Sequence, residues 1–315
     1  MKIFVGIFPS FSTPLEKEGV KPIVESQTQI MEWRQINLKQ KKIVEVPRPF
    51  IKWVGGKRQL IPQLSQYFPK KFNTYIEPFV GGGAIFFYLL PQHSVLMDIN
   101  PELINAYQVI KHKVEELIVS LQQHTNDKDY FYTVRALDRD PDSFRNLDRV
   151  ERASRTIFLN KTCYNGLFRV NKKNQFNTPF GRYKNPKLCD SFNLRAVNVA
   201  LTNTKIRLGD FGDSVNHASP DDFVYMDCPY HPVSDTANFT SYTKDDFGIA
   251  EQRRLQTVFS DLDKKGCTVL LSNSYTPFIL DLYKDYKIHT VQATRAVNCD
   301  PTKRGKVREV LVSNK

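Results

Sequence analysis

The chain lacks any Cys-x-x-Cys pair, although it contains five cysteines among its 315 residues. An odd number of widely spaced cysteines indicates neither a zinc site nor a disulfide framework, so we expect reduced thiols and no bound metal. No stretch approaches the roughly 20 apolar residues of a membrane span. The N-terminal MKIFVGIF is too short for a secretory signal. We therefore expect a cytoplasmic protein without a membrane partner.

Acidic residues are also scarce, with 33 Asp and Glu against 45 Lys and Arg and a formal net charge of +12. Between residues 152 and 187 there is no acidic residue, and nine cations fall there: Arg152, Arg155, Lys161, Arg169, Lys172, Lys173, Arg182, Lys184 and Lys187. Interleaved with them are Phe158, Tyr164, Phe168, Phe176, Phe180 and Tyr183. Such aromatic groups pack in a core or stack on bases, and the charge favours nucleic acid as partner. A solvated basic face is the alternative.

Strand and helix patterns alternate from Phe50 onward, except in one long stretch. TYIEPF and SVLMDIN predict two strands that flank the apolar helix AIFFYLL, which is a βαβ unit. From about residue 101 to 190 the periodicity is helical, and alternation resumes with TKIRLGDF and continues to VREVLVSN. We predict an α/β fold in which residues 48–100 and 191–315 form the sheet domain. Residues 101–190 form an inserted, mainly helical domain, and residues 1–47 are an extension of unknown role.

The Gly-x-Gly-x-x-Gly fingerprint of dinucleotide-binding proteins is absent. Instead, three consecutive glycines, Gly81 to Gly83, stand between the first strand and its helix, and Asp98 ends the second strand. Glycines let a ligand approach the backbone, and an acid at a strand end can accept hydrogen bonds from ribose hydroxyls. A ligand with a ribose and no pyrophosphate suits this arrangement, and S-adenosylmethionine is such a ligand.

The tetrapeptide Asp227-Cys228-Pro229-Tyr230 follows the apolar run Phe223-Val224-Tyr225-Met226. An amino group conjugated to a purine ring is a weak nucleophile, because its lone pair is delocalised into the ring. Hydrogen bonds to the Asp227 carboxylate and to the Cys228 carbonyl would stabilise positive charge that develops on this nitrogen. Tyr230 would stack on the base, which must be rotated out of a duplex to reach such a pocket.

Together these motifs resemble the adenine-N6-specific DNA methyltransferases of the Dam type, which form the D12 class with alpha-ordered motifs. The matching pieces are FIKWVGGKRQL, YIEPFVGGGAIFF, VLMDIN, LNKTCYNGLFRVNKKNQFNTPFGRYKNP, GDF, VYMDCPYHPVSDTANFTSY and, in the tail, NCDPTKRGKVREVLVSN. The resemblance does not cover residues 1–47. It implies a Rossmann-like methyltransferase sheet with helices on both faces, and a DNA-recognition domain with a β-hairpin in the insertion.

The resemblance also implies a cofactor and the residues that bind it. S-adenosyl-L-methionine would be the methyl donor and S-adenosyl-L-homocysteine the product. The cofactor-binding positions would be Trp53, Lys57, Glu77, Pro78, Phe79, Gly81, Gly83, Asp98, Asp210, Phe211 and Asp227. The catalytic positions would be Asp227, Cys228, Pro229 and Tyr230. Asp98 would hold the ribose hydroxyls, and Asp210 with Phe211 would border the cofactor adenine.

In the insertion, the resemblance implies a hairpin from Tyr164 to Arg169 that contacts the bases of double-stranded DNA. Arg169 would contact a guanine, Tyr164 would wedge into the stack left by the adenine, and Asn165 would read a base or fill the gap. The DNA-binding positions would be Tyr164, Asn165, Leu167, Arg169, Asn171, Lys172, Pro179, Arg182 and Lys184. The hairpin is similar to that of members that methylate GATC, so GATC is the predicted site. We expect a monomer on nucleoid DNA, with a cognate restriction endonuclease left open as a partner.

One position departs from the family pattern, because Cys228 stands where the family usually has proline. The backbone carbonyl is retained, and a residue that precedes proline favours extended backbone. We therefore predict an active enzyme, with a Cys228 thiol that is open to oxidation if exposed. Three alternatives remain: a methyltransferase of RNA adenine or protein glutamine, a DNA-binding homologue with an impaired catalytic centre, and a nicotinamide-dependent oxidoreductase. The glycine spacing disfavours the last of these.

Overall fold

The computed structural model of the protein describes residues 46–233, 247–294 and 306–315. Nearly all of the predicted N-terminal extension therefore lies outside the described residues. The same holds for the SDTANFTSY end of the motif that begins at Val224 and for the NCDPTKRG start of the tail motif, which includes Cys299.

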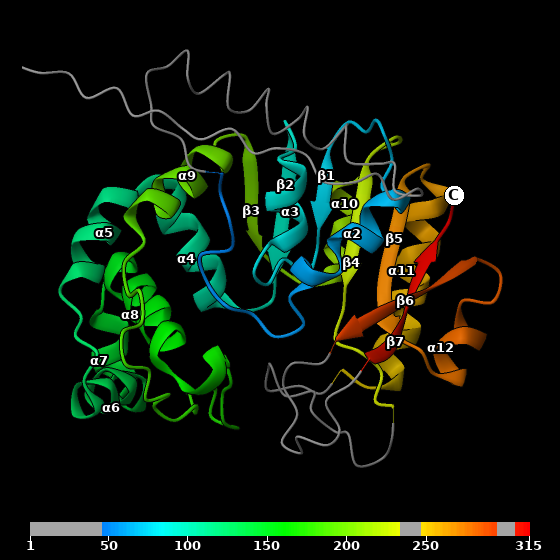
Figure 1. Cartoon of the computed structure of the whole chain (residues 1–315). Helices are drawn as coiled ribbons and strands as arrows, with labels where there is room; N and C mark the ends of the chain where they lie inside the picture. The colour runs from blue at the N-terminus through cyan, green and yellow to red at the C-terminus, as the bar shows by residue number, and fades with distance from the viewer. Residues whose placement is uncertain (1–45, 234–246, 295–305) are drawn as a thin grey trace, which may run out of the picture.

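Seven strands form one sheet in the order β3-β2-β1-β4-β5-β7-β6, seen edge to edge across Figure 1. The strands are β1 Tyr75–Glu77, β2 Ser94–Asp98, β3 Thr204–Leu208, β4 Phe223–Asp227, β5 Thr268–Ser274, β6 Lys287–Thr294 and β7 Lys306–Ser313. Strands β1 to β5 pair in parallel, whereas β7 is antiparallel to both β5 and β6. The carboxyl ends of β1 to β5 consequently meet at one edge, where ligands bind in open α/β sheets.

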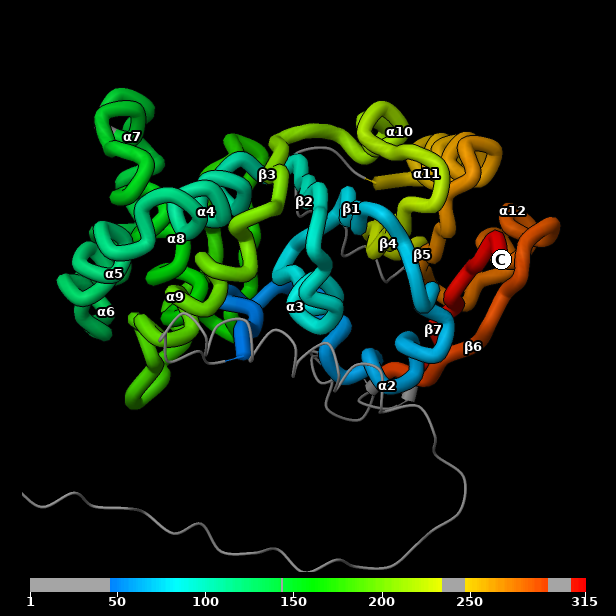
Figure 2. The backbone as a smooth tube through the Cα atoms, turned by 90° about the horizontal axis from the view of Figure 1, so that it is seen from above, coloured from blue at the N-terminus to red at the C-terminus, as the bar shows by residue number. Residues whose placement is uncertain are grey.

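Helices cover both faces of this sheet, which confirms the predicted α/β class with a Rossmann-like sheet (Figure 2). On one face pack α3 Ala84–Leu89 and α4 Pro101–His112, and on the other α11 Ile249–Lys264 and α12 Pro277–Leu282. The short α10, Ser214–His217, lies beside α11. The central strands contribute side chains to two hydrophobic cores, because successive side chains point to opposite faces. In β4, Tyr225 joins the first core and Met226 joins the second.

A group of helices lies beyond the β3 edge of the sheet (Figure 1). They are α5 Val114–Gln122, α6 Lys128–Ala136, α7 Pro141–Asn146, α8 Arg149–Thr162 and α9 Ser191–Ala200. The helical pattern from 101 to 124 is divided into α4 and α5 at Lys113, whose backbone is not helical (φ −141°, ψ 40°). Because α4 contacts both β3 and α8, it belongs structurally to the sheet and to the helical group. The domain boundaries stay a prediction.

Residues Cys163 to Phe180 form an irregular hairpin after α8. Two isolated antiparallel bridges, Cys163 with Phe180 and Val170 with Phe176, connect its arms. Its turn lies at Asn171 to Asn174, where the Asn174 amide donates to the Asn171 carbonyl at 2.8 Å. The hairpin thus extends further than the predicted stretch from Tyr164 to Arg169. At its base lies the short 3-10 turn η4, Tyr164–Gly166.

Short turns complete the fold. The stretch after Trp53 forms η1 Lys57–Gln59, α2 Ile61–Leu64 and η2 Ser65–Tyr67 in succession. The remaining 3-10 turns are η3 Leu137–Arg139 and η5 Phe211–Asp213. Within the residues given above, no helix is long and apolar enough to cross a membrane.

Candidate active site at the carboxyl edge of the sheet

Three acidic residues end neighbouring strands on the same face of the sheet. Glu77 ends β1, Asp98 ends β2 and Asp227 ends β4. Each stands two residues after a side chain of the first core (Tyr75, Leu96 and Tyr225), and side chains two apart in a strand share a face. Since β1 lies between β2 and β4, Asp98 and Asp227 are about 10 Å apart across the sheet, twice the spacing of neighbouring strands.

Asp98 is fixed by the glycine loop and by the start of α4. Its Oδ2 accepts a hydrogen bond from the Gly81 amide at 3.1 Å, and its Oδ1 accepts one from the Asn100 amide at 2.9 Å. Burial raises the pKa of Asp98 to about 6, although the amides of Asn100, Gly81 and Ile99 oppose that rise. Burial likewise raises the pKa of Glu77 well above its ordinary value. Burial thus disfavours the charged form of these carboxyl groups, and hydroxyl or ammonium groups of a ligand would stabilise that form through hydrogen bonds.

Two glycines of this loop adopt a left-handed backbone, with φ of 46° at Gly81 and 68° at Gly83. A Cβ on Gly81 would lie 2.6 Å from Cδ1 of Trp53, and one on Gly83 would lie 2.7 Å from the hydroxyl of Tyr107. Only glycine fits this conformation and this space. Trp53 thus contacts the loop, and its ring also stacks on Phe168 of the hairpin, with centroids 5.2 Å apart.

The second half of the site surrounds Asp227. The ammonium of Lys57, which is 4% exposed, lies 2.7 Å from Oδ1 of Asp227 and also donates to the Gly55 carbonyl at 2.7 Å. The same ammonium lies 4.9 Å from the centroid of the Tyr230 ring. Burial raises the pKa of Asp227, and the Lys57 cation opposes that rise. The arrangement keeps a carboxylate, a cation and an aromatic ring in contact at the end of β4.

Further residues hold the tetrapeptide, and none of them was among the sequence-based candidates. The Tyr230 hydroxyl donates to Oε2 of Glu309 on β7 at 2.8 Å, and Gln252 of α11 donates to the Pro229 carbonyl at 2.9 Å. Cys228 is 3% exposed, so its thiol is not open to oxidation from solvent. Glu309 interrupts an apolar strand pattern, which is a weak signal, whereas Gln252 carries none.

The other predicted cofactor positions lie on the loops around this edge. Pro78 is buried and Phe79 is half-buried directly after β1. Phe79 stacks on the buried Phe211, with ring centroids 5.3 Å apart. Asp210 caps η5 by accepting from the Gly212 amide at 2.8 Å, and it forms an ion pair with Arg254. The guanidinium of Arg254 lies 4.1 Å from the centroid of the Phe211 ring.

The predicted DNA-binding positions lie along the hairpin and the segment that follows it. Tyr164 is 54% exposed, and Asn165 next to it has a left-handed backbone (φ 56°). Arg169 donates to the Asn177 carbonyl at 2.9 Å, across the two arms. Asn171 accepts from the amides of Lys173 and Gln175 and so shapes the turn. Leu167 is half-buried, and the side chains of Lys172, Pro179, Arg182 and Lys184 are exposed.

The nine cations between residues 152 and 187 do not form a single surface. Arg155 is 4% exposed, and its guanidinium lies 2.9 Å from Oδ2 of Asp138. Arg152 pairs with Glu102, and burial lowers the pKa of Lys161. The aromatic residues divide as well, since Phe158, Phe168 and Phe176 are buried and Tyr164 and Tyr183 are exposed. Part of this stretch therefore belongs to the core, and the remainder faces solvent.

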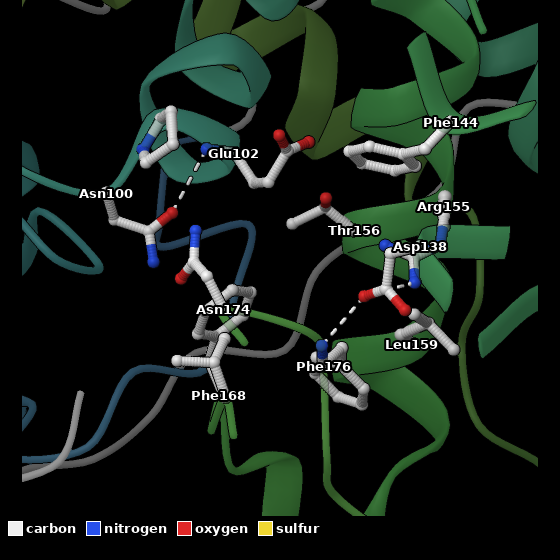
Figure 3. A pocket seen from close by; sticks show the side chains of 12 residues that line it. Asn100, Glu102, Asp138, Phe144, Arg155, Thr156, Leu159, Phe168, Asn174 and Phe176 are labelled. Atoms are coloured by element: carbon white, nitrogen blue, oxygen red, sulfur yellow. Dashed lines mark hydrogen bonds and ion pairs between the residues drawn. The ribbon is translucent and has the colours of Figure 1, made fainter. Parts of the chain in front are cut away.

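A small cavity of about 70 Å³ lies between the hairpin, the start of α4 and the middle of α8 (Figure 3). Asn100 and Glu102 line one side, Arg155 and Asp138 another, and Asn174 of the hairpin turn a third. Ligand pockets for small molecules usually occupy about 300–1,000 Å³. This cavity is too small for a nucleoside cofactor, and it lies beside the carboxylate edge. Across the described ranges, no group of three or more His, Cys, Asp or Glu side chains is placed to hold a metal ion.

Comparison with known proteins agrees with this geometry. Residues 53–297 match the family model of D12 class N6 adenine-specific DNA methyltransferases. The chain is 46% identical over 283 residues to the type II methyltransferase M1.LlaDCHI of Lactococcus lactis subsp. cremoris, covering 89% of this chain and 99% of that protein. It is 43% identical over 287 residues to the type II methyltransferase M.MjaIII of Methanocaldococcus jannaschii, covering 85% and 99%. It is 35% identical over 271 residues to the DNA adenine methylase of Haemophilus influenzae, covering 84% and 92%.

The fold and these matches define an adenine-specific DNA methyltransferase. The chain belongs to the D12 class of N6 adenine-specific DNA methyltransferases, and its relatives include enzymes named DNA adenine methylases. This confirms the family that the sequence motifs indicated.

Proposed function

We propose that the enzyme transfers a methyl group from S-adenosylmethionine to N6 of an adenine rotated out of duplex DNA, within GATC. The observation that carries this proposal is the arrangement of Asp98 and Asp227. Both end strands on one face of the sheet, with the glycine loop at the first and an aromatic ring and a cation at the second. Two reactants that bind at these strand ends would meet between them.

The residues around Asp98 fit the cofactor. The carboxylate can accept hydrogen bonds from two ribose hydroxyls, and its partners Gly81 and Asn100 hold it in place. Gly81 and Gly83 adopt the left-handed backbone that shapes this loop, and loops of this kind at the carboxyl end of a first strand bind nucleotide ligands. Phe79 and Phe211 present aromatic rings next to Asp210, where the adenine of the cofactor would lie. When bound, S-adenosylmethionine supplies an electrophilic methyl group.

Asp227 and the residues that follow it would bind the amino group of the target base and make it more nucleophilic. One oxygen of Asp227 pairs with Lys57, and among the residues that the structure describes nothing occupies the other, which would accept a hydrogen bond from the amino group. The Cys228 carbonyl accepts the second amino hydrogen, and both acceptors stabilise the positive charge that develops on N6 as it attacks the methyl carbon. Tyr230 would stack on the base with the ring face opposite Lys57, an interaction worth about 1–3 kcal/mol.

The hairpin would supply contacts to the duplex. Tyr164 is the exposed aromatic side chain at its base and would occupy the gap left by the rotated adenine. Arg169 would contact O6 and N7 of a guanine, and the exposed cations Lys172, Arg182 and Lys184 would bind phosphates. The similarity to enzymes named DNA adenine methylases supports adenine in DNA as the substrate over RNA adenine or protein glutamine.

Methylation of defined duplexes tests this proposal. Purified enzyme with methyl-labelled cofactor should label a duplex that contains GATC and leave a duplex with a permuted site unlabelled, and RNA of the same sequence should not compete. Labelling at other DNA sites would overturn the predicted recognition sequence but not the methyltransferase activity. DNA binding without labelling would instead favour an impaired homologue, and stabilisation by NAD rather than by S-adenosylhomocysteine would favour an oxidoreductase.

A cognate endonuclease, a monomeric state on DNA and a cytoplasmic location on the nucleoid belong to the same proposal. Two relatives carry the designation type II methyltransferase, and a third is named a DNA adenine methylase. Sedimentation of the enzyme with a GATC duplex would distinguish one protomer per site from two.

A further inference from the structure

We propose that Gln252 and Asn273 are positioning residues for methyl transfer, which hold the Cys228 carbonyl toward the amine of the base. This inference rests on the function proposed above. It adds two residues from α11 and β5 that lie outside the tetrapeptide. Both side chains are fully buried, and their amide groups bond to each other and to the loop.

The contacts hold the main chain on the carboxyl side of Cys228. Nε2 of Gln252 donates to the Pro229 carbonyl at 2.9 Å, and Oε1 of Gln252 accepts from Nδ2 of Asn273 at 3.0 Å. Oδ1 of Asn273 accepts from the His231 amide at 3.1 Å. On the other side, Asp227 is held by its register with Ser272 in the sheet. The peptide between these anchors has little freedom to rotate.

The thiol of Cys228 takes part in the same network. Its sulfur lies 3.3 Å from Nδ2 of Asn273, which donates to it, and it donates to the Ser272 carbonyl at 3.6 Å. Burial raises the pKa of this thiol far above its ordinary value, so the group stays protonated and remains a donor. Proline restricts a backbone through its ring and has no donor. At this position the chain replaces the ring of the family with side-chain contacts to β5.

Such anchoring matters because the hydrogen bond from the amine must form at the transition state. Catalytic groups need to be held within about 0.5 Å of their productive position, and a displacement of about 1 Å can cost about 10²-fold in rate. Loss of either side-chain amide would leave the partly buried Pro229 carbonyl or His231 amide without this partner and let the loop shift.

Single-turnover methylation of a GATC duplex by Gln252→Leu and Asn273→Leu tests the inference. We expect the rate constant to fall about 10- to 100-fold, while the affinities for S-adenosylhomocysteine and for DNA change by less than about 2-fold. Gln108→Leu is the matched control, because Gln108 donates to the Ile206 carbonyl at 2.8 Å, away from the loop. Its rate should be unchanged.

A second pair of variants changes Cys228 and leaves the side-chain amides of Gln252 and Asn273 in place. Cys228→Ala removes both sulfur contacts, and Cys228→Ser keeps a donor, so the serine variant should retain more of the rate than the alanine variant. Equal rates for the two, or leucine variants that lose cofactor affinity in proportion to rate, would overturn the positioning role. If the unmodified enzyme labels no DNA at all, the proposed function fails and takes this inference with it.

Discussion

The carboxyl edge of the sheet and the hairpin differ in how their polar groups are held. At the edge, Lys57 is 4% exposed and bonds to Asp227 and Gly55, and the tetrapeptide is bonded to α11 and to two strands. In the hairpin, two isolated β-bridges join the arms, Arg169 donates across them to the Asn177 carbonyl, and Tyr164 is 54% exposed. On the proposed function, the fixed contacts of the edge would hold the reacting groups in place, whereas the exposed side chains of the hairpin would adapt to a duplex. A site that must place one atom needs many fixed contacts, and a surface that must follow a helix does not.

The cations show the same division within one stretch of sequence. Arg155 is internal and paired with Asp138, while Lys172, Arg182 and Lys184 are exposed. Net charge alone therefore overstates the surface that is free to bind phosphates.

Removal of the Asp227 carboxylate is the largest expected effect. Asp227→Ala should lower the single-turnover rate of methylation about 10³-fold, because the amine loses its main charged acceptor. Stabilisation of the protein by S-adenosylhomocysteine should persist, since Asp98 remains. A variant that methylates at the normal rate would show that the edge does not carry the chemistry.

Arg155→Ala sharpens the division among the cations. It would remove a buried guanidinium that pairs with Asp138 and donates to the Val134 and Arg135 carbonyls. Asp138 keeps Arg139 and the Phe176 amide as partners, so we expect the free energy of unfolding to fall by about 1–3 kcal/mol. Urea unfolding measures the loss. The control is Arg182→Ala, whose exposed side chain should leave stability unchanged. Equal destabilisation by the two would contradict the assignment of Arg155 to the core.

Arg169→Ala should weaken discrimination at one base pair by about 1–3 kcal/mol and leave the cofactor affinity unaltered. Competition between duplexes with single substitutions in GATC measures this effect. The control is Lys172→Ala, which should weaken binding to all duplexes alike and reduce its salt dependence. Unchanged discrimination in Arg169→Ala would remove this residue from base recognition.

Cofactor affinity should fall as the pH drops through about 6, the raised pKa of Asp98. Above that pH the carboxylate accepts the ribose hydroxyls, and below it the affinity should decline about 10-fold per pH unit. In the folded protein the pKa of Asp98 lies above its ordinary value of 3.8. Ionisation of Asp98 therefore lowers the free energy of unfolding as the pH rises from about 4 to about 6. Its titration therefore makes the apo protein more stable as the pH falls, which separates loss of affinity from unfolding. Titration calorimetry of Asp98→Asn should show weak binding without this pH dependence.

Much of the fold could be predicted from the sequence, because the spacing of apolar residues was regular and turn-forming residues marked the ends of the elements. The predicted strands TYIEPF and SVLMDIN contain β1 and β2, and the apolar run Phe223 to Met226 lies in β4. Gly266 follows α11 with φ of 89°, as a glycine just past a helix end should. The break at Lys113 was not visible, because the apolar pattern continues through it. The partners of the tetrapeptide were not accessible either. Gln252, Asn273 and Glu309 meet it only because α11, β5 and β7 pack beside β4.

The sequence by itself determined the order of the motifs, the class of fold and the family, since these depend on local periodicity and on residue types at short spacing. Only the tertiary structure decided which cations are internal and which side chains hold Cys228. Burial and hydrogen bonding depend on contacts between residues far apart in the chain, and no local pattern specifies those contacts. The departure at Cys228 is accordingly accounted for by its neighbours in space, Ser272 and Asn273.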